Sequence, residues 1–275
     1  DGIKINSKNS GTHAALLAGV QFIICAVAVT LAARFTLPEG LGLGLDRAQF
    51  GQRAHWVDAP VLALAALFLL LPLVAVVADG APALLHLPDL VWAAALRSAL
   101  MAMAAALLSV TAALILVQAK VAGAAWVEGA AMLPLATSGL VLGTGLFLLT
   151  RSVASPETLA LPVTVLVNAL MALPFLFRLL LPQARDLHRN YDRLAQTLGL
   201  SGAARLRWLT LPRLARPLGM GAGLAAALSM GDLGVVALFA GQDQATLPLV
   251  VQRLSGAYRM DQAAAAALVL VACSL

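Results

Sequence analysis

Long apolar stretches separated by short polar connections dominate the pattern along this chain. The run from Val61 to Ala78 contains no charged residue, and the run from Val165 to Phe177 contains one polar side chain, Asn168. Uncharged stretches of about 18 or more residues are typical of transmembrane helices. The pattern predicts an all-α, polytopic transmembrane helical bundle of about seven spans, at 13–33, 58–78, 91–118, 129–150, 160–183, 215–240 and from 260 onward.

The composition agrees with a membrane protein. Of 275 residues, 61% are hydrophobic and only 11% are charged, against roughly a quarter charged in soluble domains. When 185–212 is placed in the cytoplasm, twelve of the eighteen Lys and Arg residues fall inside and five outside, as the positive-inside rule requires. Arg97 falls within a span, and its side chain is expected to reach toward the interface. The net charge of +5 is therefore a topology signal, and no nucleic-acid partner is expected.

The sequence suggests no catalytic centre, metal site or cofactor. None of the four histidines pairs with another at ligand spacing, and Cys25 and Cys273 both lie in apolar runs. The chain also lacks the G-x-x-x-x-G-K-[ST] phosphate loop. ATP hydrolysis is therefore not expected on this chain.

The connection after the fifth apolar segment predicts a basic helix–turn–helix element. One stripe of an amphipathic helix is formed by residues at spacings of four, three and four, namely Leu187, Tyr191, Leu194 and Leu198. Gly199 follows where a left-handed C-terminal cap is favoured, Ser201 suits the N-cap of a second short helix, and Pro212 is expected to end that helix. Such an element either rests on anionic lipid or docks into a groove on a cytoplasmic partner.

The stretch RLAQTLGLSGAARLRWLTLP at 193–212 resembles the cytoplasmic loop of bacterial ABC-importer permeases. That signature reads E-A-A, three residues, G, nine residues, I-x-L-P. Gly199 is the signature glycine, and the other matched positions are Arg193, Leu194, Ala195, Leu209, Leu211 and Pro212. The chain departs from the signature with Arg for Glu, Leu for the first Ala and Leu for Ile.

The resemblance extends over about 58–275. The stretch SMGDLGVVALFAGQDQATLPLVVQRLSGAYRMDQAAAAALVL, from Ser229 onward, is most similar to the subgroup of thiamine and thiamine pyrophosphate permeases, in which two permease halves are fused in one chain. The resemblance implies that 58–275 is a permease core cut off at its C-terminal end. It also implies that 13–57 is the last span of a preceding half plus a cytoplasmic linker. The atypical segment 1–12 is expected to be a tag or junction.

The family implies a non-enzymatic, multi-pass permease subunit of the bacterial inner membrane. A periplasmic binding protein would deliver thiamine or its phosphates, and a separate ATPase homodimer would dock on the 185–212 loop. The second permease half would lie in the same full-length chain. The implied coupling residues are Leu187, Tyr191, Leu194, Ala195, Leu198, Gly199, Leu209, Leu211 and Pro212.

Asp232 is the candidate for the substrate path, because an ionisable group deep in a span is costly and by default marks a functional or paired site. It would either contact a cationic substrate or fix a helix break between Gly231 and Gly234 by a structural hydrogen bond. Asn168 and Ser138 are lesser path candidates that also suit helix–helix hydrogen bonds. The Gly219/Gly223 pair has the spacing that permits close helix packing.

Two other functions stay open at this point. Permeases for ferric iron or another inorganic ion share the fused architecture. An ion-coupled secondary transporter is a rival from a different class, but such proteins usually need several intramembrane charges. A neighbouring gene for a thiamine-type binding protein would favour the thiamine permease.

Overall fold

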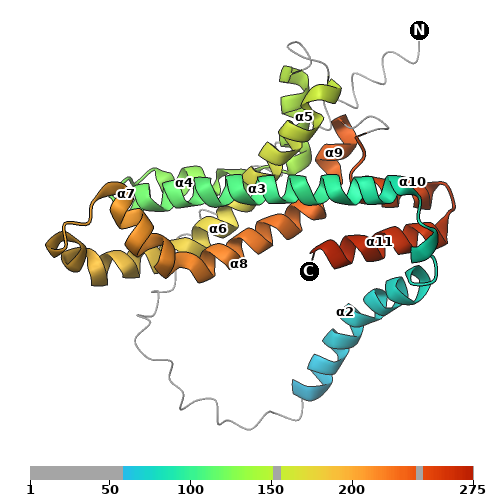
Figure 1. Ribbon diagram of the computed structural model, residues 1–275, viewed down its shortest axis with the longest axis horizontal. Coiled ribbons are helices and arrows are strands. Elements are labelled where there is room, and N and C mark those ends of the chain that lie inside the picture. The colour runs from blue at the N-terminus through green and yellow to red at the C-terminus, as the bar shows by residue number, and fades with distance from the viewer. Residues whose placement is uncertain (1–57, 151–155, 240–243, 275) are drawn as a thin grey trace. The chain divides into compact units, whose positions relative to one another are not determined.

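The computed structural model describes residues 58–150, 156–239 and 244–274. The chain divides into two units, 1–74 and 75–275, and in the first unit only the start of α2 is among the described residues. Each element in the described part is a helix (Figure 1). The elements are α2 (Asp58–Gly80), η2 (Leu84–His86), α3 (Asp89–Val121), α4 (Val127–Met132), η3 (Leu133–Ala136), α5 (Gly139–Thr150), α6 (Pro156–Thr197), α7 (Gly202–Arg205), η4 (Leu206–Thr210), α8 (Leu211–Met230), α9 (Gly234–Phe239), α10 (Leu247–Gly256) and α11 (Met260–Ser274).

The all-helical character is confirmed, and the predicted number of about seven spans is not. Within the described ranges, four segments are long and apolar enough to cross a membrane, or five if one bent pair of helices counts as a span. The predicted span at 13–33 lies outside the described residues. The last predicted span, from 260 onward, begins with α11 (Met260–Ser274).

The segment predicted as one span at 129–150 is broken into two helical parts. Its two parts, Val127–Ala136 and Gly139–Leu149, are bent by 94°. Ser138 starts the second part, because its Oγ accepts a hydrogen bond from the backbone N–H of Val141 at 3.3 Å. Hydropathy registers only how apolar a segment is, so it does not show that a capping residue has started a new helix there.

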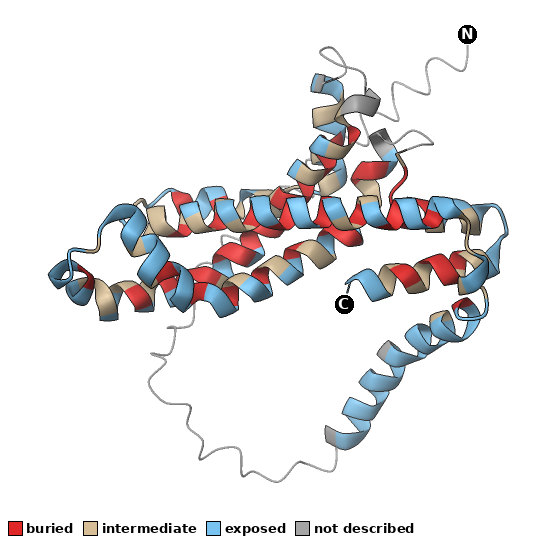
Figure 2. Ribbon diagram, viewed as in Figure 1, coloured by how far each residue is buried: buried red, intermediate tan, exposed pale blue. Residues whose placement is uncertain are grey.

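The core of the second unit is formed where α3, α6 and α8 pack side by side (Figure 1). Buried positions lie on the sides of α3 and α8 that face the other helices (Figure 2). On α3 these positions are mostly small residues, including Ala94, Ser98, Ala102, Ala105, Ser109 and Ala113. On α8 four buried residues recur every fourth position: Pro217, Gly221, Ala225 and Ser229. Small side chains let helices approach closely, which is a main source of packing energy in a membrane.

The closest approach of α8 to α6 is at Gly221. It is not at the Gly219/Gly223 pair that the sequence suggested. A Cβ built on Gly221 would lie 3.0 Å from Cγ of Leu176 on α6, whereas nothing lies within 4 Å of a Cβ built on Gly219 or Gly223. Gly219 and Gly223 are exposed. The prediction that they form the packing contact within this chain is therefore wrong.

Arg97 ties the start of α10 to α3. Its Nη1 donates a hydrogen bond to the carbonyl oxygen of Ala245 at 3.1 Å, and the neighbouring Ser98 Oγ accepts one from the backbone N–H of Leu247 at 2.8 Å. Arg97 thus binds a backbone carbonyl of the connection between α9 and α10. Arg97 and Ser98 together hold the connection that precedes α10 against α3.

We expect Gly221→Val to destabilise the protein by about 1–3 kcal/mol, the usual effect of overfilling a packed core. Leu176 is fully buried, so it has little room to move away from the new side chain. The check is thermal unfolding of the detergent-solubilised full-length protein. Gly223→Val on the same helix is the matched control and should change stability by less than about 0.5 kcal/mol. Equal effects of the two changes would contradict this packing.

Candidate functional site

The predicted helix–turn–helix is the tip of a long hairpin. α6 continues without interruption to Thr197, so the stripe at 187–198 is not a separate helix as predicted. Gly199 follows in the left-handed conformation with φ +63°. The N–H of Leu200 donates to Ala195 O at 2.8 Å and the N–H of Gly199 donates to Gln196 O at 3.0 Å, which together form a Schellman cap. The predicted capping role of Gly199 is confirmed.

The returning leg also differs from the predicted short helix. Ser201 is the N-cap of α7 in backbone geometry, but its side chain makes no capping hydrogen bond. α7 continues through a π-helical turn, η4, directly into α8. Pro212 lies in the first turn of α8, where a missing backbone N–H is tolerated. The expectation that Pro212 ends the helix is therefore wrong.

Charged contacts hold the two legs of the hairpin together. Arg205 of α7 forms an ion pair with Asp192 of α6, and its Nη2 donates to Nδ1 of His188 at 3.2 Å. On α8, the guanidinium carbon of Arg213 lies 4.5 Å from the ring centroid of Tyr191, within the range of a cation–π contact. Two residues of the returning leg, eight positions apart, thus contact the same helical turn of α6, 188–192.

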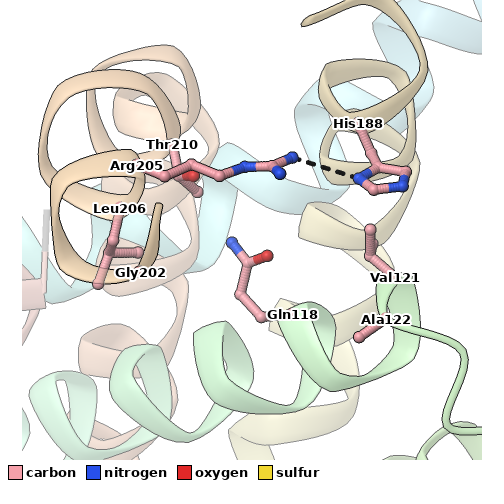
Figure 3. Close-up of a pocket in the computed structure, with 8 residues that line it drawn as sticks. All are labelled: Gln118, Val121, Ala122, His188, Gly202, Arg205, Leu206 and Thr210. Atoms are coloured by element: carbon pink, nitrogen blue, oxygen red, sulfur yellow. Dashed lines mark hydrogen bonds between the residues drawn. The ribbon is translucent and has the colours of Figure 1, made fainter. Parts of the chain in front are cut away.

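A cavity of about 410 Å³ lies beside this ion pair, between α3, α6 and α7. Figure 3 shows Arg205 pointing across the cavity toward His188, with Gln118 of α3 pointing into the same space. Sequence reasoning missed His188, Asp192 and Arg205. Asp192 and Arg205 have opposite charges, but they lie on different legs, and only the geometry of the turn brings them together.

The predicted coupling residues are divided between the inside and the outside of the hairpin. Leu187 and Ala195 are buried, and Tyr191 and Leu209 are partly buried. Leu194 and Leu198 are 51% and 64% exposed. The exposed group also includes Gly199, Leu211 and Pro212. The division arises because the returning leg packs along the side of α6 that carries His188, Asp192 and Ala195, so it leaves the two distal leucines uncovered.

The path candidates lie at the opposite end of α6 and α8. Asp232 occupies the non-helical break between α8 and α9, and its Oδ1 accepts a hydrogen bond from the N–H of Gly234 at 3.2 Å. Asn168 of α6 is buried, and its Nδ2 donates to Ser229 Oγ at 3.0 Å. Ser138 is exposed and caps α5. The structure brings Asn168 and Asp232 together around one cavity, whereas Ser138 has a local capping role.

Metal chemistry finds no support in the part of the chain that the structure describes. No group of three or more His, Cys, Asp or Glu side chains in these ranges could hold a metal ion. Cys273, which lies in an apolar run, is a free, exposed thiol, and Cys25 lies outside the described residues.

Comparison with curated proteins gives a consistent set of relatives, although no family model matches the chain. It is 38% identical over 277 residues to the thiamine transport system permease protein ThiP of Salmonella typhimurium strain LT2, covering 94% of this chain and 51% of the relative. ThiP of Escherichia coli K12 is 35% identical over 275 residues, with the same coverage. ThiP of Brucella abortus is 38% identical over 218 residues, which are 76% of this chain and 40% of the relative.

The chain is similar to the ThiP permeases over nearly its whole length. The predicted resemblance to bacterial ABC-importer permeases of the thiamine subgroup is thereby confirmed. The chain spans about half the length of the curated relatives it matches.

We expect Gly199→Val to weaken the tip of the hairpin, because a side chain at positive φ costs about 1–2 kcal/mol. Gly199→Asn is the matched control, since asparagine tolerates this backbone conformation. Hydrogen exchange of the amides at 195–200 in the full-length protein measures the change. Exchange should become about tenfold faster in the valine variant, and much less so in the asparagine variant. Equal protection in all three proteins would show that the cap does not stabilise the turn.

Proposed function

We propose that this chain is part of the permease of an ATP-driven thiamine importer in a bacterial inner membrane. The observation that carries the proposal is the 38% identity with ThiP of Salmonella typhimurium over 94% of the chain. The apolar helices long enough to span a membrane support a multi-pass location. Thiamine or one of its phosphates is the transported substrate.

The proposed importer has three further components. A periplasmic binding protein delivers thiamine, a homodimer of ATP-binding subunits hydrolyses ATP, and a second permease half lies in the same full-length chain. The chain itself is not an enzyme, because hydrolysis belongs to the ATPase subunits. The matched signature at 193–212, which lies on an exposed hairpin tip, supports docking of an ATPase on the cytoplasmic side.

The exposed leucines are the proposed docking contacts. Leu194 and Leu198 present apolar surface at the end of a hairpin that also carries exposed arginines, including Arg189 and Arg193. An apolar helix tip of this kind suits a hydrophobic groove on a partner. In this account the buried Leu187 and Ala195 do not touch the ATPase. They hold the hairpin in the shape that presents the two leucines.

Transmission to the membrane rests on continuous helices. α6 runs from the spans into the hairpin, and the ion pair between Arg205 and Asp192 connects the returning leg to it. ATP biases the conformation of the spans only if the ATPase states contact the hairpin differently. A shift of the tip would then move α6 and α8 together.

The proposal predicts that the full-length protein, reconstituted in liposomes with its ATPase and candidate binding proteins, takes up labelled thiamine only when ATP is present. Uptake of labelled ferric iron should stay at the background level of empty liposomes. ATP-dependent uptake of iron in place of thiamine would agree with an ATP-driven importer but would contradict thiamine as its substrate. Thiamine uptake that is independent of ATP would indicate an ion-coupled transporter and contradict the proposal.

The same preparation tests the docking contacts. Leu198→Asp should lower ATP-dependent uptake and co-purification of the ATPase by at least about tenfold, as burial of a charge at a central contact would. Gln183→Glu is the matched control, because it adds the same charge at an exposed position of the same helix, about three turns before Leu194. Equal losses in both variants would point to a general effect of negative charge on the hairpin.

A further inference from the structure

The break between α8 and α9 interrupts a segment that is otherwise long and apolar enough to cross a membrane, Gly202–Ala237. Residues 231–233 are not helical, so their backbone groups need other partners at this depth. Asp232 supplies one of them, because its Oδ1 accepts the N–H of Gly234 at the start of α9. One oxygen of this carboxylate therefore has a structural role.

The second oxygen of Asp232 has no such role. Oδ2 is buried and has no hydrogen-bond partner among the described residues. Asn168 lies beside the carboxylate. One of the two N–H groups of its amide donates to Ser229 Oγ at 3.0 Å, and no hydrogen bond of standard geometry joins Asn168 to Oδ2. A buried carboxylate oxygen without a partner is costly, and a cap on α9 needs only the other oxygen.

A cavity of about 280 Å³ adjoins this carboxylate. It lies where α5, α6 and the α8–α9 break come together, and its lining includes Gly139, Asn168, Met171, Phe175 and Asp232. Its volume is near the lower limit of ligand pockets, about 300–1,000 Å³. It suits one ring of a substrate and is too small for a large molecule.

The lining has the chemistry that recognises a cationic ring. A carboxylate supplies the opposite charge, and the face of Phe175 attracts cations through its ring quadrupole. Met171 adds a polarisable wall that adapts to an aromatic edge. In the described part of the lining no basic side chain is present to oppose a cation.

We infer that this cavity is the subsite for the positively charged ring of the transported substrate, with Asp232 Oδ2 as its counter-ion and Phe175 as its aromatic wall. The inference rests on the proposed function, since the thiazolium ring of thiamine carries a permanent positive charge. Asn168 orients the carboxylate from the side, and Asp232 Oδ1 keeps the α8–α9 break in place while Oδ2 binds the ring.

The substitution Asp232→Asn distinguishes the structural role of Oδ1 from the proposed binding role of Oδ2. The amide oxygen of asparagine still accepts the N–H of Gly234, so the break is preserved, while the charge is lost. In ATP-dependent uptake by the full-length reconstituted transporter, this variant should raise the half-saturating concentration of thiamine at least about tenfold. Uptake of a neutral thiophene analogue of thiamine, measured in the same vesicles, should change by less than about twofold.

Two further variants complete the test. Phe175→Leu should raise the half-saturating concentration of thiamine about threefold or more through loss of the cation–π contact. Asp89→Asn, which removes an exposed aspartate at the start of α3, should leave the uptake of both compounds unchanged. The midpoint of thermal unfolding of each variant is recorded beside the transport data.

The possible outcomes distinguish this inference from the proposed function. Unchanged thiamine uptake in Asp232→Asn and Phe175→Leu would overturn the cation subsite and leave the importer intact. Equal loss of thiamine and of the neutral analogue, with a lower unfolding midpoint, would show a structural role alone and also overturn it. If the unaltered transporter carries no thiamine, the proposed function fails, and the subsite assignment fails with it.

Discussion

The close packing of α3, α6 and α8 is the constraint on which the other features depend. Small residues on α3 and α8 allow large α6 side chains such as Leu176 and Phe177 to be fully buried between the helices. In a membrane, water does not drive helices together, so contacts of this kind hold the bundle. The packing makes α6 and α8 one mechanical unit instead of two independent spans.

The packed pair of α6 and α8 has a candidate functional site at each end. The hairpin tip, with Gly199 and the exposed Leu194 and Leu198, ends α6 on the proposed cytoplasmic side. At the other end, Asn168 of α6 and the α8–α9 break with Asp232 line one cavity. A displacement of the tip that is carried along both helices would reach the cavity walls. In the proposed mechanism, helix packing would therefore connect docking at the tip with substrate contact at the cavity.

Local signals along the sequence were sufficient for part of this structure. The apolar runs predicted α2, α3 and the membrane part of α6, and the stripe ending at Gly199 predicted its cap, because these features depend on neighbouring residues. The break at Ser138, the pairing of Asp192 with Arg205 and the contact at Gly221 depend on how distant segments meet. The depth of Asp232 was evident from hydropathy, but the different environments of its two oxygens required three-dimensional geometry.

The most direct test of this account is a distance along α6 in the complete transporter, with nitroxide labels in place of the exposed Leu166 and Arg189 and the native cysteines replaced. The two sites are about 35 Å apart along a continuous helix. Pulsed electron paramagnetic resonance should give the same distance, within about 2 Å, without nucleotide and with a non-hydrolysable ATP analogue, because α6 moves as a rigid lever. A clear shortening with the analogue would show that α6 bends between hairpin and cavity, and would contradict their coupling through one rigid unit.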